Sequence, residues 1–120
     1  MASDFKDLIV WKKSMDLVEI TYGLVKAFPR EEQFELASQM RRAAVSIPSN
    51  IAEGQGRKTD REFLRFLSIA RGSRAELETQ LLLAQRLGYL SAAQAAPALS
   101  LSSEIGKMLF SLSESLQTTD

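Results

Sequence analysis

The sequence contains neither cysteine nor histidine. Without cysteine it cannot form disulfides, thiolate zinc sites or a cysteine nucleophile, which fits a reducing, cytoplasmic setting. Without histidine it lacks the commonest general base, the commonest metal ligand and the Glu-x-x-His pairs of di-iron bundles. These absences remove most common enzymatic chemistries, and we predict neither a metal site nor a cofactor.

Long apolar runs and phosphate-binding glycine loops are also missing. No stretch approaches the roughly 18–20 apolar residues of a membrane span, and residues 1–7 carry acids where a secretory signal is apolar. Gly54-Gln55-Gly56 lacks a third glycine and a preceding strand, so it is more simply a helix end and turn. Ser46, Ser49 and Ser73 have no histidine to activate them. We therefore expect a non-enzymatic cytoplasmic protein that does not enter a membrane.

What the sequence does contain is apolar residues at helical spacing, in four successive segments. The steps alternate between three and four residues, and no segment alternates with the period of two that a strand requires. The four series, which we expect to face the core, are Leu8, Trp11, Met15, Val18, Tyr22 and Val25; Ala37, Met40, Ala44, Ile47 and Ile51; Phe63, Leu67, Ala70, Leu77, Leu81 and Ala84; and Leu101, Ile105, Met108, Leu112 and Leu116.

Capping signals divide the chain at the same places. Asp7 is placed to cap the first helix, Thr59 and Ser91 begin capping boxes, and Gly88 follows the third helix. Because the connections are short, neighbouring helices must be antiparallel. We predict an all-α, antiparallel up-down-up-down four-helix bundle with helices near 8–28, 31–55, 59–88 and 91–117. It forms one domain over 5–117, with flexible ends at 1–4 and 118–120.

Two prolines fall inside this pattern. Pro48 lies within the second helix, where a missing N–H and a ring clash cost about 3 kcal/mol. The apolar series passes through it without losing phase, so we expect a kinked but continuous helix, with Ser46, Ser49 and Asn50 satisfying freed backbone groups. Pro97 lies beyond the first turn of the fourth helix, so either the helix bends there or a short turn precedes it.

The net charge is zero, but residues 41–74 hold eight basic and three acidic side chains, a net of +5. One interpretation is a surface that binds nucleic-acid backbone, and the other is a solvated helix face paired with acids. The main candidates lie around the second connection, and the rest are weaker: Arg57, Lys58, Arg61 and Arg65; then Arg41, Arg42, Arg71 and Arg74. Arg41 and Arg42 can instead pair with Glu53 or with acids of a neighbouring subunit.

Two stripes lie away from the apolar series and predict a subunit interface. At about 100° per residue, each set shares one helix face. Small side chains allow a second helix to approach closely, and exposed Ile69 and Leu83 would otherwise favour nonspecific association. The predicted interface residues are Arg42, Ser46, Asn50 and Glu53 on the second helix, and Ser68, Ile69, Gly72, Ala75, Thr79 and Leu83 on the third.

Three stretches resemble a known family. They are Phe5-x-Asp7-Leu8-x-Val10-Trp11-Lys12, the segment from Ser38 to Gly54 with its Ser46-Ile47-Pro48-x-Asn50-Ile51-Ala52-Glu53-Gly54 core, and Glu62-Phe63-x-Arg65-Phe66-Leu67 continuing to Gln80. They are similar to the four-helix-bundle proteins encoded in intervening sequences of 23S ribosomal RNA genes, the S23 family. The resemblance covers residues 5–116 and implies a ring-shaped homopentamer. It extends distantly to accessory variability proteins of diversity-generating retroelements, which bind nucleic acid and a reverse transcriptase.

Two functions from different classes remain open. The first is a homo-oligomer that binds RNA or DNA backbone through the basic residues. The second is an oligomeric scaffold or adaptor for a protein partner, such as a reverse transcriptase, with the charges serving assembly and solubility. The sequence alone does not choose between them.

Overall fold

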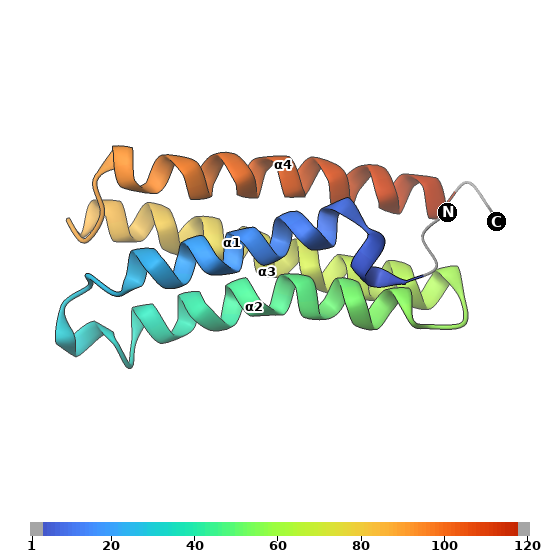
Figure 1. The fold of residues 1–120 in the computed structure, drawn as a ribbon, viewed down its shortest axis with the longest axis horizontal. Coiled ribbons are helices and arrows are strands. Elements are labelled where there is room, and N and C mark those ends of the chain that lie inside the picture. The colour runs from blue at the N-terminus through green and yellow to red at the C-terminus, as the bar shows by residue number, and fades with distance from the viewer. Residues whose placement is uncertain (1–3, 118–120) are drawn as a thin grey trace.

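The computed structural model describes residues 4–117 as four antiparallel helices in up-down-up-down order (Figure 1). They are α1 (Ile9–Val25), α2 (Leu36–Gln55), α3 (Asp60–Arg86) and α4 (Ala92–Gln117), with short 3-10 turns at Phe5–Asp7 and Arg30–Glu32. No strand occurs in this range, and the bundle is 47 Å long. The predicted fold class is confirmed. The expected flexible ends fall outside the described residues except for Asp4, whose carboxylate accepts from the Lys6 N–H.

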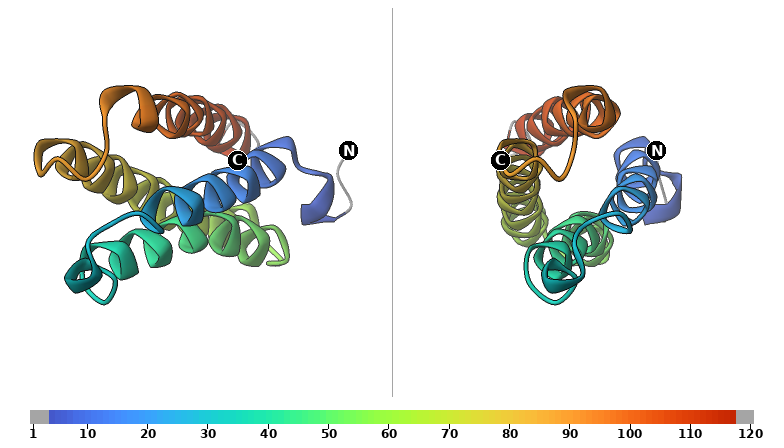
Figure 2. Two further views of the ribbon diagram at one scale, coloured as in Figure 1. Left: turned by 60° about the vertical axis from the view of Figure 1, so that its left-hand side comes forward. Right: turned by 90° about the vertical axis from the view of Figure 1, so that its left-hand side faces the viewer.

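The helices pack in a cycle in which each contacts its sequence neighbours and α1 also contacts α4 (Figure 2). The series expected for α2 is buried at every position, and in α3 only Phe63 is half-buried. The largest fully buried side chains come from all four helices: Leu17, Met40, Ile47, Ile51, Leu67, Leu77, Leu81, Ile105 and Leu109. Burial of such side chains is the main favourable contribution to folding.

The expected core face of α1 is only partly correct: Val25 is buried, and Leu8, Trp11 and Val18 are half-buried against the core. The buried residues are Val10, Ser14, Leu17, Thr21 and Val25, whereas Met15 and Tyr22 are exposed. Ser14 and Thr21 can be buried because each hydroxyl donates to the carbonyl four residues earlier, at 2.7 and 2.8 Å. Counting only apolar residues therefore selected a face about one residue away from the real one.

The expected core face of α4 is displaced in the same way. Leu101, Met108, Leu112 and Leu116 are half-buried at the edges of the core, and Ile105 is fully buried. The centre of the face also contains two serines: its buried residues are Ala95, Ala98, Ser102, Ile105, Leu109 and Ser113. Ser113 donates to the Leu109 carbonyl at 2.8 Å, as Ser14 and Thr21 do in α1.

The helix ends follow the capping signals with one exception. Thr59 accepts from the Glu62 N–H at 3.1 Å, and Ser91 and Gln94 cap each other at 2.8 and 3.0 Å. Gly88 has φ of +80°, its N–H donates to the Gln85 carbonyl, and the Tyr89 N–H donates to the Ala84 carbonyl, which together form a Schellman turn. Asp7 does not cap α1: it lies in the 3-10 turn that Asp4 caps, and α1 follows Leu8 without a side-chain cap.

Both prolines lie inside continuous helices. Helix α2 runs through Pro48, which is buried, and α4 begins at Ala92 and runs through Pro97, so no separate turn precedes Pro97. Next to Pro48, the Asn50 side-chain amide donates to the carbonyl of Ser46 at 2.8 Å and to its hydroxyl at 3.0 Å.

The connection between α1 and α2 is longer than expected because α2 begins at Leu36 instead of residue 31. The Gln33 side chain donates to the carbonyls of Val25 and Phe28 at 2.9 and 3.2 Å, which closes the end of α1. Arg41 then donates to the Gln33 carbonyl at 2.8 Å. The side chains of Gln33, outside the helices, and of Arg41, in α2, therefore replace the helical hydrogen bonds that this segment lacks.

A second set of contacts joins this connection to the turn between α3 and α4. The Tyr89 hydroxyl donates to a Glu32 carboxylate oxygen at 2.7 Å, and the Tyr89 ring lies 5.3 Å from the Phe28 ring. The hydrogen bond to Glu32, then burial and the negative charges of Glu32 and Glu31, raise the pKa of Tyr89 above its usual 10.0. Among the described helices, none has the length and apolar character needed to span a bilayer.

Candidate nucleic-acid interface

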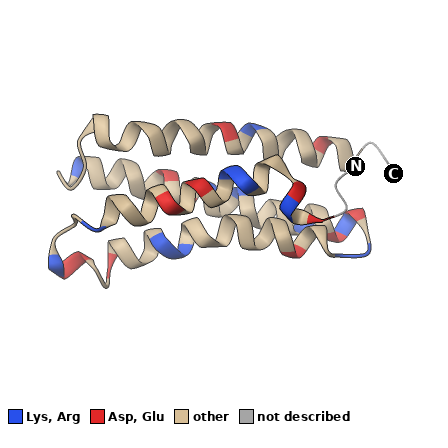
Figure 3. Cartoon of the chain, viewed as in Figure 1, with Lys and Arg blue, Asp and Glu red and all other residues tan. Residues whose placement is uncertain are grey.

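The four main basic candidates lie at one end of the bundle, around the connection between α2 and α3 (Figure 3). Arg57, Lys58, Arg61 and Arg65 are all exposed. The guanidinium groups of Arg57 and Arg65 lie 4.8 and 5.2 Å from the centroid of the same Phe66 ring. Cation–π attraction to one buried ring therefore holds two of the four cations close together, although one precedes α3 and the other belongs to it.

Acidic side chains reduce the positive charge at this end. Glu53 accepts from Arg57 at 3.0 Å, an exposed pair on successive turns. Lys58, Arg61 and Arg65 have no carboxylate within ion-pair distance among residues 4–117. At the start of α3, the Thr59 cap occupies the Glu62 N–H. The charge available to an anion thus comes mainly from the side chains rather than from the helix terminus.

Arg41 and Arg42 lie far from this end. Helix α2 runs between Arg42 and Arg57, and at 1.5 Å per residue the two are separated by about 20 Å along the helix. Arg41 is half-buried and donates hydrogen bonds to Gln33, so in this structure it stabilises the α1–α2 connection. Neither arginine pairs with Glu53 within the described chain, because Glu53 lies about three turns farther along α2, where it pairs with Arg57. The basic block of the sequence is therefore not one patch in space.

Arg71 and Arg74 lie midway along α3, facing α4. Arg74 donates to the Glu78 carboxylate at 2.8 Å and to the buried Ser102 hydroxyl at 3.2 Å, crossing from α3 to α4. Arg71 is exposed, and its guanidinium lies 5.6 Å from the centroid of the Phe110 ring. Arg74 is thus a structural contact, whereas Arg71 remains accessible.

The predicted interface residues of α2 are partly used inside the subunit. The hydroxyls of Ser46 and Ser73 lie 2.8 Å apart and join α2 to α3, and Asn50 donates to Ser46. Arg42 and Glu53 are exposed. The α2 stripe therefore runs along the edge of the α2–α3 contact, and only its two ends are open to another subunit.

The predicted interface residues of α3 are all exposed: Ser68, Ile69, Gly72, Ala75, Thr79 and Leu83. Ile69 and Leu83 are 41% and 43% exposed, so the stripe includes accessible apolar surface. Thr79 and Leu83 also line a shallow hollow of about 250 Å³. The placement leaves this stripe available for contact with a second molecule.

Sequence reasoning missed an apolar groove between α1 and α2. It encloses about 320 Å³ and is lined by residues of both helices: Trp11, Met15, Val18, Val45, Pro48, Ser49 and Ala52. Three of these belong to the series that we expected in the core. The apolar series of the first helix contained these residues, but it lies on an outward face of α1, next to α2.

Comparison with known proteins agrees with the fold. Residues 6–111 match the family described as 23S rRNA-intervening sequence protein. A solved structure of a protein of unknown function from the S23 ribosomal protein family of Bacteroides thetaiotaomicron is 27% identical, with a TM-score of 0.79. The match covers 88% of this chain and 98% of that one. No curated protein matches the sequence. Because the family match spans most of the bundle, the chain belongs to the 23S rRNA-intervening sequence protein family.

Proposed function

We propose that this protein is a non-enzymatic homo-oligomer that binds the backbone of RNA or DNA. The observation that carries the proposal is the exposed cluster of Arg57, Lys58, Arg61 and Arg65, of which only Arg57 has an ion-pair partner among residues 4–117. Arginine and lysine side chains at the end of a rigid helical bundle can neutralise phosphates regardless of base sequence. Binding of this kind is largely sequence-independent and weakens steeply as salt increases.

Assembly into an oligomer would raise the affinity of the basic cluster for nucleic acid. The family resemblance is the reason for proposing a pentamer, since the periodicity of the helices gives no number. The exposed α3 stripe around Leu83 supports self-association. Each subunit of a ring would present its own basic cluster, and several linked clusters bind one polyanion far more tightly than one does.

An electrophoretic shift assay at two salt concentrations tests nucleic-acid binding. The variant Arg61→Ala/Arg65→Ala removes two exposed cations from the cluster. On duplex DNA we expect the slope of log affinity against log salt to become shallower by up to about 1.8, or roughly 0.9 for each phosphate that the variant no longer neutralises. The matched control is Lys26→Ala/Arg30→Ala, which removes two exposed cations from the opposite end and should leave the slope unchanged.

Equal binding by wild type and the cluster variant, or no binding by wild type at low salt, would contradict this function. The second candidate, an oligomeric scaffold for a protein such as a reverse transcriptase, would then be favoured. Its specific support is the α1–α2 groove, where Trp11, Met15 and Val45 form an apolar surface that α3 and α4 do not cover.

A further inference from the structure

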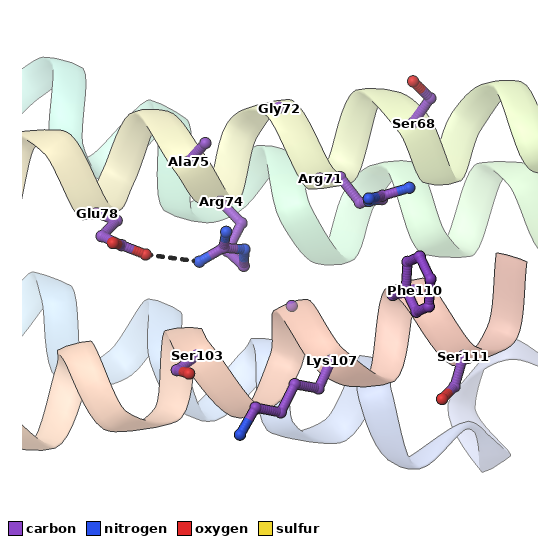
Figure 4. A pocket seen from close by; sticks show the side chains of 11 residues that line it. Ser68, Arg71, Gly72, Arg74, Ala75, Glu78, Ser103, Lys107, Phe110 and Ser111 are labelled. Carbon is purple, nitrogen blue, oxygen red and sulfur yellow. Dashed lines mark hydrogen bonds and ion pairs between the residues drawn. The ribbon is translucent and has the colours of Figure 1, made fainter.

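A hollow lies between α3 and α4, lined by residues of these two helices (Figure 4). It encloses about 760 Å³. Small residues on both helices, among them Gly72 on α3 and Ser103 on α4, keep it wide. A Cβ added at Gly72 would meet no atom within 4 Å, so the groove is open next to that helix backbone.

Arg74 forms a bridge across the groove. Its side chain lies over Gly106, where a Cβ would come within 2.8 Å of the Arg74 Nε. Its guanidinium is held by Glu78 on α3 and Ser102 on α4. Because Arg74 and Glu78 neutralise each other, this pair gives the groove a rigid polar wall and little net charge.

The accessible positive charge comes from Arg71 and Lys107. Both are exposed, and neither has a carboxylate of residues 4–117 within ion-pair distance. Since Glu78 is paired with Arg74, the groove presents two uncompensated cations to solvent. A groove of this charge favours an anionic ligand.

The groove also contains an exposed aromatic ring. Phe110 on α4 is 52% exposed, and the Arg71 guanidinium lies 5.6 Å from its centroid (Figure 4). Phe110 is not part of the hydrophobic core. Arg71 lies beside the ring, and Lys107 lies one turn earlier on the same helix as Phe110 and also lines the groove. An exposed aromatic ring combined with unpaired cations in one groove is the arrangement with which proteins hold single-stranded nucleic acid: bases stack on the ring and phosphates contact the cations.

We propose that the α3–α4 groove binds single-stranded RNA or DNA, with one base stacked on Phe110 and the adjoining phosphates at Arg71 and Lys107. A duplex keeps its base faces stacked internally and offers none to Phe110, so the groove discriminates in favour of single strands. The inference rests on the proposed function, and it adds a second binding surface in the middle of the bundle, distinct from the basic cluster at its end.

The test is fluorescence anisotropy with a labelled 12-nucleotide single strand and the corresponding duplex, using the full chain. Phe110→Ala should weaken single-strand binding about 5- to 150-fold, the equivalent of one base that no longer stacks on a ring, and leave duplex binding unchanged. Phe110→Trp, which keeps an aromatic face, should bind the single strand about as tightly as wild type. Lys107→Ala should reduce the single-strand salt slope by about 0.7, whereas Phe110→Ala should leave that slope unchanged.

Matched controls are available elsewhere on the surface. Phe34→Ala removes another exposed phenylalanine, 88% accessible in the α1–α2 connection, and Lys26→Ala removes an exposed lysine at the end of α1. Circular dichroism and light scattering on each variant establish that the fold and the oligomeric state are retained.

Four outcomes would overturn the inference. If Phe110→Ala binds single strands as well as Phe34→Ala does, the ring is not a stacking surface. If only Arg61→Ala/Arg65→Ala weakens binding, the proposed function stands and the groove has no part in it. If Phe110→Ala dissociates the oligomer, the groove is a subunit interface. Failure of wild type to bind any nucleic acid would remove both proposals together.

Discussion

At the scale of single residues, hydrogen bonding decides which polar side chains enter the core. Ser14, Thr21 and Ser113 are buried because each hydroxyl bonds to the carbonyl four residues earlier in its own helix. Their polarity then carries little desolvation cost. A pattern of apolar residues cannot reveal these positions, because serine and threonine can make the same local hydrogen bond whether they are buried or exposed.

Tyr89 gives a residue-scale prediction. The hydrogen bond to Glu32 raises the pKa of Tyr89. The hydrogen bond therefore stabilises the fold fully at a pH below the usual pKa of tyrosine. This stabilisation is lost as the pH rises through the raised pKa. Tyr89→Phe should therefore lower the urea midpoint at pH 8, and the difference from wild type should shrink with increasing pH above about 10.

Tyr22→Phe is the control for this experiment, because Tyr22 is 42% exposed and its hydroxyl makes no hydrogen bond to residues 4–117 in the structure. It should show no comparable pH-dependent difference. A Tyr89→Phe deficit that persists unchanged through the alkaline range would contradict the role assigned to the Glu32 hydrogen bond.

At the scale of helices, the start and end of α3 and the start of α4 were predictable, whereas the cap of α1 and the start of α2 were not. The buried faces were predicted only in part. Thr59, Ser91 and Gly88 act locally, within a few residues of the chain, so their patterns translate directly into observed caps. The buried faces of α2 and α3 consist almost wholly of apolar residues and were predicted correctly. The face of α1 was not, because its second apolar series, which includes Trp11 and Met15, is the stronger one and lines a groove on the surface.

Gly54 gives an element-scale prediction about the α2–α3 contact. It is buried, and a Cβ there would lie 2.7 Å from the Phe66 Cβ and 3.0 Å from the Phe63 Cδ1. Gly54→Ala should therefore push the two helices apart and lower the free energy of unfolding by about 1–3 kcal/mol.

Gly23 provides the matched comparison. It is exposed within α1, and a Cβ there meets no atom within 4 Å. Gly23→Ala should raise the free energy of unfolding by roughly 0.5–1 kcal/mol, since alanine is the better helix former. Chemical denaturation measures both variants. Equal effects at the two positions would show that the close contact at Gly54 does not limit packing.

At the scale of the whole molecule, topology separates what the sequence places together. Residues 41–74 form one basic block in the chain, but α2 and α3 run in opposite directions along the bundle. Arg41 bonds to the α1–α2 connection. Arg57 and Arg65 contact the Phe66 ring near the α2–α3 connection. Arg71 faces α4 midway along α3. Of the predicted nucleic-acid site, the main cluster is therefore brought together, and the weaker candidates are distributed elsewhere.

The proposed assembly gives a prediction at this scale. Leu83→Asp places a charge on the exposed α3 stripe, where Leu83 is 43% accessible in the subunit. The subunit should keep its helical circular dichroism signal, and light scattering should show dissociation, because a buried, unpaired carboxylate is costly in an interface. Ser100→Asp, an exposed position on α4, should leave the assembly intact. A wild-type monomer at tens of micromolar would contradict the assembly itself.

The sequence by itself determined the all-α class, the number of helices, their approximate limits and the antiparallel order, because caps, periodicity and short connections act over a few residues. The tertiary structure alone decided which face of α1 is buried, where Gln33 and Arg41 bond, and that Arg71 of α3 meets Phe110 of α4 in a groove. These features depend on side chains that are distant in sequence and are brought together only when helices pack, so no local pattern contains them.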